Sequence, residues 1–117
     1  MSAQNQSYSP GERLAMEFTE DIVANVFATY AGDLCTVGDI PAGITEVAYS
    51  DGDFGSVIAS GTALLKIATS IAAGTELTPN ASGLGIAATT GKYVGAIARF
   101  AGVTNQLIEV ELTKYIK

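Results

Sequence analysis

The sequence predicts a mainly β fold: a small single-domain β-barrel or sandwich of short strands with an extended N-terminal arm. Three observations support this prediction. The chain has 117 residues, a length that fits one compact domain. Its apolar residues make up 48% of the chain, far more than an acidic disordered tail contains. From Gly32 onward, Gly, Pro and Asp-Gly turn signals interrupt the chain every few residues and leave short segments between them.

Residues 1–10 form the predicted flexible arm. They are rich in Ser, Gln, Asn and Tyr, which bury little surface. Pro10-Gly11 is a turn signal. We therefore expect a single β-rich domain over residues 11–117.

Residues 12–30 fit two patterns. One pattern is helical, since a spacing of four would place four apolar residues on one helix face: Leu14, Phe18, Ile22 and Val26. The other pattern is the alternation of two short strands on either side of Glu20-Asp21, the first with Leu14, Met16 and Phe18 and the second with Val23, Asn25 and Phe27. The strand-rich remainder of the chain favours the strands.

The later strands are expected between turn signals, at residues 44–49, 56–60, 62–68, 75–78, 93–100 and 106–112. Gly43, Gly61 and Gly74 each precede a Thr-containing segment, so each is expected in a turn that begins a strand. Residues 41–43 are expected to interrupt the chain in the same way.

The last two segments are the clearest hairpin. The five residues 101–105 make a plausible hairpin loop. This pairing would place Arg99 diagonally across from Glu109 on one sheet face, where such an ion pair contributes about 0.2–1 kcal/mol. Glu109 and Glu111 are expected to face solvent.

Charge is distributed unevenly along the chain. The net charge is −6 overall, but residues 12–53 carry nine acids and one base, while residues 54–117 carry three acids and five bases. The six scattered Lys and Arg residues argue against direct binding of nucleic acid or of a membrane surface. The acidic half is either a solvated face or one end of a dipolar subunit that docks on a complementary surface.

The composition argues against an enzyme. The chain has no His, which excludes Ser–His and Cys–His catalysis and His-bound metals. Its single cysteine, Cys35, cannot form an internal disulfide and is predicted to be a buried, inert thiol. The N-terminus lacks the apolar segment of a signal peptide, and no apolar run reaches the roughly 20 residues of a membrane span.

No cofactor or metal is predicted from the motifs. Residues 83–88 match G-x-G-x-x-A, but the turn-rich residues before and after them favour a glycine-rich hairpin over the strand and helix that a dinucleotide requires. Asp51 and Asp53 do not make a calcium loop, because the positions for the further ligands hold Gly55 and Thr62.

The glycine-punctuated pattern resembles the small bacteriophage capsid decoration proteins, also called cement or head-stabilising proteins. The likeness covers roughly the last 105 residues and is carried by residues 31–34, 55–61, 71–78, 93–98 and 107–112. It implies a virion structural protein that is assembled in the host cytoplasm and binds the outer surface of the mature phage head. There it would clamp neighbouring subunits of the major capsid protein. It also implies a homo-oligomer, with a trimer favoured and a dimer possible.

The arm and the start of the domain are the predicted capsid contacts, with Tyr8, Pro10, Arg13 and Leu14 as candidates. The arm would order on binding by adding a strand to a capsid sheet. Two alternatives remain open: another virion building block, such as a tail-tube or head–tail joining subunit, and a small non-catalytic ligand-binding β-domain.

Overall fold

The computed structural model describes residues 10–117, so Tyr8 and most of the predicted arm lie outside the described part of the chain. Over these residues the chain forms strands only. They are β1 (Arg13–Glu17), β2 (Phe27–Thr29), β3 (Pro41–Thr45), β4 (Phe54–Ile58), β5 (Thr62–Lys66), β6 (Glu76–Pro79), β7 (Gly85–Ala87), β8 (Tyr93–Ala98) and β9 (Leu107–Ile116).

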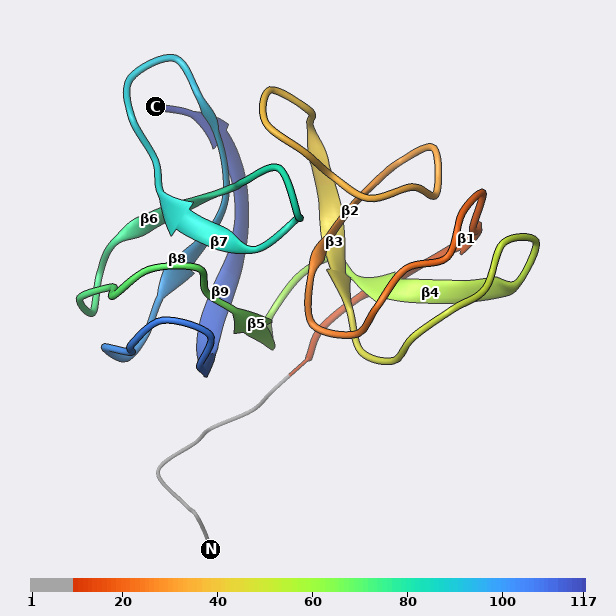
Figure 1. Ribbon diagram of the computed structural model, residues 1–117, viewed down its shortest axis with the longest axis horizontal. Helices are drawn as coiled ribbons and strands as arrows, with labels where there is room; N and C mark the ends of the chain where they lie inside the picture. Colours follow the sequence, from red (N-terminus) through yellow and green to blue (C-terminus); the bar gives the residue numbers. More distant parts are fainter. Residues whose placement is uncertain (1–9) are drawn as a thin grey trace, which may run out of the picture.

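The strands form two antiparallel sheets (Figure 1). The four-stranded sheet has the order β1-β4-β3-β2, and the five-stranded sheet has the order β5-β9-β8-β6-β7. A parallel bridge between Ile67 and Gly85 draws the two edges of the five-stranded sheet together into a half-barrel. The predicted β fold is confirmed. No helix in the described residues is long and apolar enough to cross a membrane.

Residues 12–30 contain two strands and no helix, as expected, but β1 ends before Phe18 and β2 begins only at Phe27, so the expected strand through Val23 and Asn25 is wrong. In β1 the side chains of Leu14 and Met16 are half-buried, while those of Arg13, Ala15 and Glu17 are exposed. This period of two is the pattern of a strand with one covered face.

Both predicted hairpins are present. β6 and β7 pair through residues 77–87, which confirms the glycine-rich hairpin. In the β8–β9 hairpin, Ala98 pairs with Val110, and the Arg99 amide donates a hydrogen bond to the Glu109 carbonyl over 3.1 Å. Arg99 therefore lies directly opposite Glu109 rather than diagonally across from it.

The predicted exposure of Glu109 is wrong. Glu111 faces solvent, but Glu109 is 1% exposed, and its carboxylate lies 2.5 Å from the Arg99 guanidinium. Glu109 lies on the same sheet face as Glu111, but it sits between Leu64 of β5 and Arg99, so its burial is set by these cross-strand neighbours and not by the alternation along β9. Burial of this carboxylate is offset by the charge-assisted hydrogen bond from Arg99.

Two predicted glycine turns are confirmed and one is wrong. Gly61 and Gly74 have φ values of +79° and +86° in turns. Gly43, together with Pro41, instead lies inside β3. A Cβ on Gly43 would lie 2.4 Å from the Ile58 carbonyl oxygen of β4, so glycine here allows close strand contact.

The buried side chains form two clusters. The main core lies between the sheets and includes Phe27, Ile44 and Ile58 from the four-stranded sheet, and Leu65 and Leu77 from the five-stranded one. The second cluster belongs to the four-stranded sheet and its loops, with the Phe18 and Tyr49 rings stacked 4.2 Å apart.

Cys35 is fully buried in the main core, as predicted. Burial, helped by the negative charges of Asp39 and Asp33, raises the pKa of the Cys35 thiol to about 12. A thiol with this pKa is not a nucleophile near neutral pH.

Candidate docking surface

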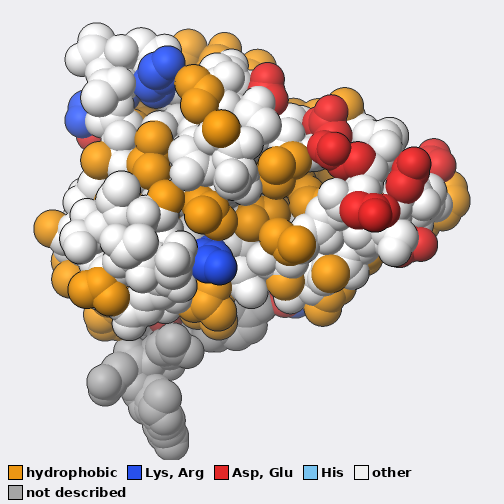
Figure 2. Space-filling view, in the orientation of Figure 1, with side chains coloured by type: hydrophobic (Ala, Val, Ile, Leu, Met, Phe, Trp, Pro, Cys, Tyr) orange, Lys and Arg blue, Asp and Glu red, His pale blue; other side chains and the backbone are white. Residues whose placement is uncertain are grey.

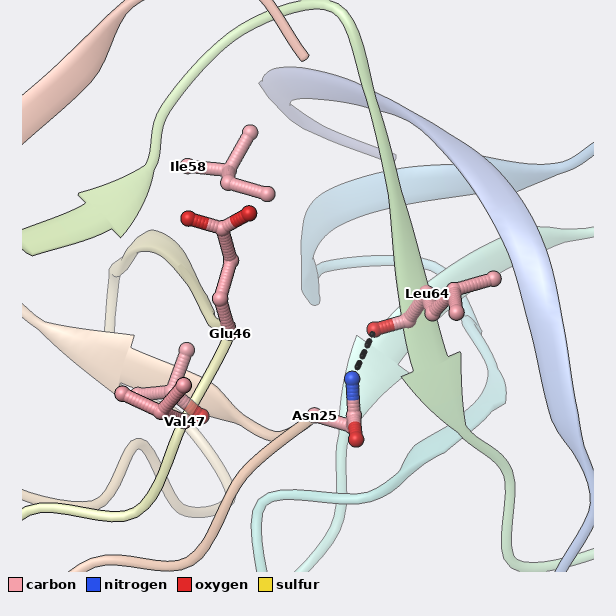
Figure 3. A pocket seen from close by; sticks show the side chains of 6 residues that line it. Asn25, Glu46, Val47, Ile58 and Leu64 are labelled. Carbon is pink, nitrogen blue, oxygen red and sulfur yellow. Dashed lines mark hydrogen bonds between the residues drawn. The ribbon is translucent and has the colours of Figure 1, made fainter. Parts of the chain in front are cut away.

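A groove of about 310 Å³ lies between the two sheets (Figure 3). We call it the inter-sheet groove. Its lining is part apolar and part polar and comes from both sheets: Asn25, Thr45, Glu46, Val47, Ile58 and Leu64. Val47 is 53% exposed, so an apolar side chain remains accessible at the groove.

Asn25 joins the two sheets at the base of this groove. Its amide donates to the Thr45 carbonyl and its carbonyl accepts from the Lys66 amide, each over 2.9 Å or less. Its side-chain amide donates to the Leu64 carbonyl over 3.2 Å (Figure 3). These three bonds require a φ of +65°, a conformation that asparagine tolerates better than most residues.

The ion pair between Arg13 and Glu46 crosses β4 beside the groove. Two hydrogen bonds of 2.8 and 3.0 Å join the guanidinium to the carboxylate. Both side chains are partly exposed, so this pair contributes little more than about 1 kcal/mol to stability.

The structure separates the predicted contact residues. Arg13 contacts the groove residue Glu46, and Pro10 bridges to Gly61 in the connection between β4 and β5. Leu14 points to the other face of the sheet and packs against the second cluster. Tyr8 lies outside the described residues. Contact with a capsid remains a prediction for all four.

A second, more open hollow of about 460 Å³ lies on the loop between β2 and β3. It is lined by Thr29, Tyr30, Ala31, Asp33, Gly38, Asp39 and Ile40. The Lys114 ammonium lies 5.8 Å from the centre of the Tyr30 ring, which brings the end of β9 beside it. Sequence reasoning missed both hollows. The inter-sheet groove joins residues far apart in the chain, and the second hollow depends on the fold of a single loop, residues 29–40, which has no repeating pattern in the sequence.

The acidic and basic residues, which are unevenly distributed along the sequence, are also unevenly distributed over the surface of the folded chain. Residues 12–53, with nine of the twelve acids, build most of the four-stranded sheet and its loops. In Figure 2 the acidic side chains gather over the end of the molecule where Figure 1 places β1 and β4. No group of three His, Cys, Asp or Glu residues in the described chain is arranged to hold a metal.

Polar side chains of Tyr115 and Lys117 also attach the end of β9 to Glu76 of β6. The Lys117 ammonium lies 3.1 Å from the Glu76 carboxylate, which also accepts a hydrogen bond from the Tyr115 hydroxyl. The bonds from Tyr115 and Lys117 lower the pKa of Glu76, and the bond to Glu76 raises the pKa of Tyr115. The lowered pKa keeps the Glu76 carboxylate ionised. A carboxyl group that acts as a general acid needs a raised pKa, so the contacts at Glu76 do not suit it for that role.

Comparison with known proteins finds a shared fold. No protein-family model and no curated protein matches the sequence. Among solved structures, the N base of the head fibre protein gp8.5 of bacteriophage phi29 is similar, with a TM-score of 0.71 at 14% sequence identity. The match covers 87% of this chain and 93% of the phi29 chain. At this identity, the match establishes that the two chains share a fold.

Proposed function

We propose that this protein is a structural component of a phage head, and more specifically a decoration protein. It binds the outer surface of the mature shell and stabilises it by bridging neighbouring subunits of the major capsid protein. The observation that carries the proposal is the fold shared with a phage head fibre base over 87% of the chain. The resemblance of residues 55–61 and 107–112 to decoration proteins supports it independently.

The chemistry of the surface suits a protein that holds other subunits. An acidic four-stranded sheet and a near-neutral five-stranded one form a dipolar body, which orients on a complementary surface. In a homo-oligomer, trimer or dimer, several weak contacts act together at high effective concentration. The proposed role is non-catalytic and needs no cofactor.

Co-sedimentation with purified heads tests the proposal. The full chain is expected to pellet with expanded heads at a fixed copy number and to raise the temperature at which the shells disrupt. A protein that pellets with neither expanded nor unexpanded heads contradicts the proposal. Rings or tubes of the purified protein in electron micrographs would favour a joining or tail-tube subunit instead.

Two variants locate the contact. Deletion of residues 2–9 together with Arg13→Ala is expected to weaken binding to heads by tenfold or more, since both changes lie in the predicted contact region. Lys92→Ala, at a partly buried position in the turn between β7 and β8, is the control outside the predicted contact region and should bind normally. Equal binding by the two variants would exclude the arm and Arg13 from the contact.

A further inference from the structure

The edges of the two sheets differ in how they are covered. β2 is covered because the Phe27 amide donates to the Gly83 carbonyl and Ala28 bridges to Leu34. β5 is covered by the two hydrogen bonds that Asn25 makes to residues 64 and 66. β7 is covered by the bridge between Gly85 and Ile67. Within residues 10–117, β1 is the edge without such a cover along its middle.

The register of β1 shows which of its backbone groups point outward. The Phe18 amide donates to the Asp53 carbonyl, and the Glu12 carbonyl accepts from the Ala59 amide, so even-numbered residues bond to β4. The intervening residues point their N–H and C=O groups away from β4 because antiparallel pairing alternates. The N–H and C=O of Ala15 and the N–H of Glu17 therefore face the outer side of the sheet.

Charged side chains, which oppose pairing with another strand, stand only at the two ends of this edge, at Arg13 and Glu17, and leave its middle without such a block. Residues 13–17 include no proline or lysine, and the pairing with β4 runs without a bulge. Ala15 is small and exposed, so a second backbone can approach it. The turn at Gly32 closes the edge beyond Glu17, because it lies against the Glu17 carbonyl. The open segment is therefore short and centred on Ala15.

The charge around the edge indicates the kind of strand that it would accept. The Glu17 end of β1 is surrounded by exposed acids: Glu17, Glu20, Asp21, Asp51 and Asp53. Backbone and side-chain bonds hold this end together, since Gly52 donates to the Phe18 carbonyl over 2.7 Å and Asp51 donates to the Asp21 carboxylate over 2.9 Å. A basic segment gains attraction here, whereas an acidic one is repelled.

We infer that the β1 edge accepts an extended, basic segment of the shell protein as an added antiparallel or parallel strand. Main-chain hydrogen bonds at Ala15 supply the docking, and the acids beside Glu17 select the charge. The inference rests on the proposed function for the source of the segment. Here the shell protein supplies the strand and β1 of this chain accepts it. In the prediction for residues 1–10, by contrast, this chain supplies the strand and the capsid sheet accepts it.

A proline at the edge gives the sharpest test. Ala15→Pro removes an outward N–H and leaves the hydrogen bonds to β4 in place. It is expected to weaken binding to expanded heads by about tenfold. The control Ala15→Ser keeps the N–H and should bind within about twofold of the wild type. Wild-type binding should also weaken with added salt.

Amide hydrogen exchange on the wild-type protein tests the same edge without a substitution. On binding to heads, exchange at Ala15 and Glu17 is expected to slow by about tenfold or more, because these amides gain partners. This measurement decides the matter if Ala15→Pro does not fold.

The outcomes separate the two proposals. A wild type that does not bind heads overturns the proposed function and the inferred source of the strand together. A wild type that binds, with equal binding by Ala15→Pro and Ala15→Ser and no slowing at Ala15, overturns the edge alone. A third result is a wild type that dimerises in the absence of heads, with Ala15→Pro abolishing the dimer. That result also overturns the inference, because the strand added to the β1 edge would then come from a second copy of this chain.

Discussion

The two sheets differ in the length of their longest strand, in charge and in burial. The five-stranded sheet is built around the ten-residue strand β9, which pairs with both β5 and β8, and its residues carry a small positive charge. The four-stranded sheet has strands of three to five residues, long loops and most of the acids. The first supplies most of the main core, whereas the second carries an open edge and lines much of the inter-sheet groove. Most of the main core and the proposed docking edge thus lie in different sheets.

The largest expected effect tests whether the two sheets unfold as one unit. Phe27 belongs to the four-stranded sheet, but it is fully buried in the main core, and its ring packs on Gly95 of β8. Phe27→Ala is expected to lower the free energy of unfolding by about 3–5 kcal/mol. Urea denaturation, followed by circular dichroism, measures the loss.

Phe54→Ala is the matched control, because Phe54 is 79% exposed. It is expected to change the free energy of unfolding by no more than about 0.5 kcal/mol. A loss below about 1 kcal/mol for Phe27→Ala, or two separate transitions, would mean that the sheets are independent.

The next effect concerns the loop that closes the end of the β1 edge. Gly32 and Gly38 have the same φ of +88°. Around Gly38 there is open space, so Gly38→Ala is expected to cost only the strain of a left-handed residue, about 1–2 kcal/mol. A Cβ on Gly32 would lie 2.0 Å from the Glu17 carbonyl oxygen, so Gly32→Ala should cost about 1–3 kcal/mol more.

Thermal unfolding of the two variants measures this difference directly. Since φ is equal at both positions, their difference isolates the contact with β1. Equal melting temperatures would show that the loop at Gly32 does not contact β1. The Glu17 carbonyl would then be open as well, and the open edge would extend past Glu17.

The two regions also differ in how far the sequence predicts them. The β8–β9 hairpin and the alternation in β1 follow from local patterns, and both are present. Gly43 was expected in a turn because glycine permits turns, but it also permits close strand contact, and a single sequence does not distinguish the two uses. The burial of Glu109 depends on its neighbouring strands, and so lies beyond any local rule.

The sequence predicts the charge of the candidate docking surface but not its shape. The acidic bias of residues 12–53 is visible in the sequence and is found on one end of the molecule (Figure 2). The inter-sheet groove joins Asn25, Ile58 and Leu64, which are far apart in the chain. Only the arrangement of both sheets brings these residues together.

The smallest expected change in the free energy of unfolding concerns the hydrogen bond by which Asn25 joins the two sheets at the inter-sheet groove. Asn25→Gly keeps the positive φ but loses the bond from the side-chain amide to the Leu64 carbonyl, at an expected cost of about 0.5–1.5 kcal/mol. Asn25→Ala loses the same bond and adds about 1–2 kcal/mol of left-handed strain. Chemical denaturation of both variants separates the two contributions. If the two variants are equally stable, the backbone at Asn25 has moved out of its left-handed conformation. The bonds to Thr45 and Lys66 would then be the first to break, and the groove would lose the contact that joins its two walls.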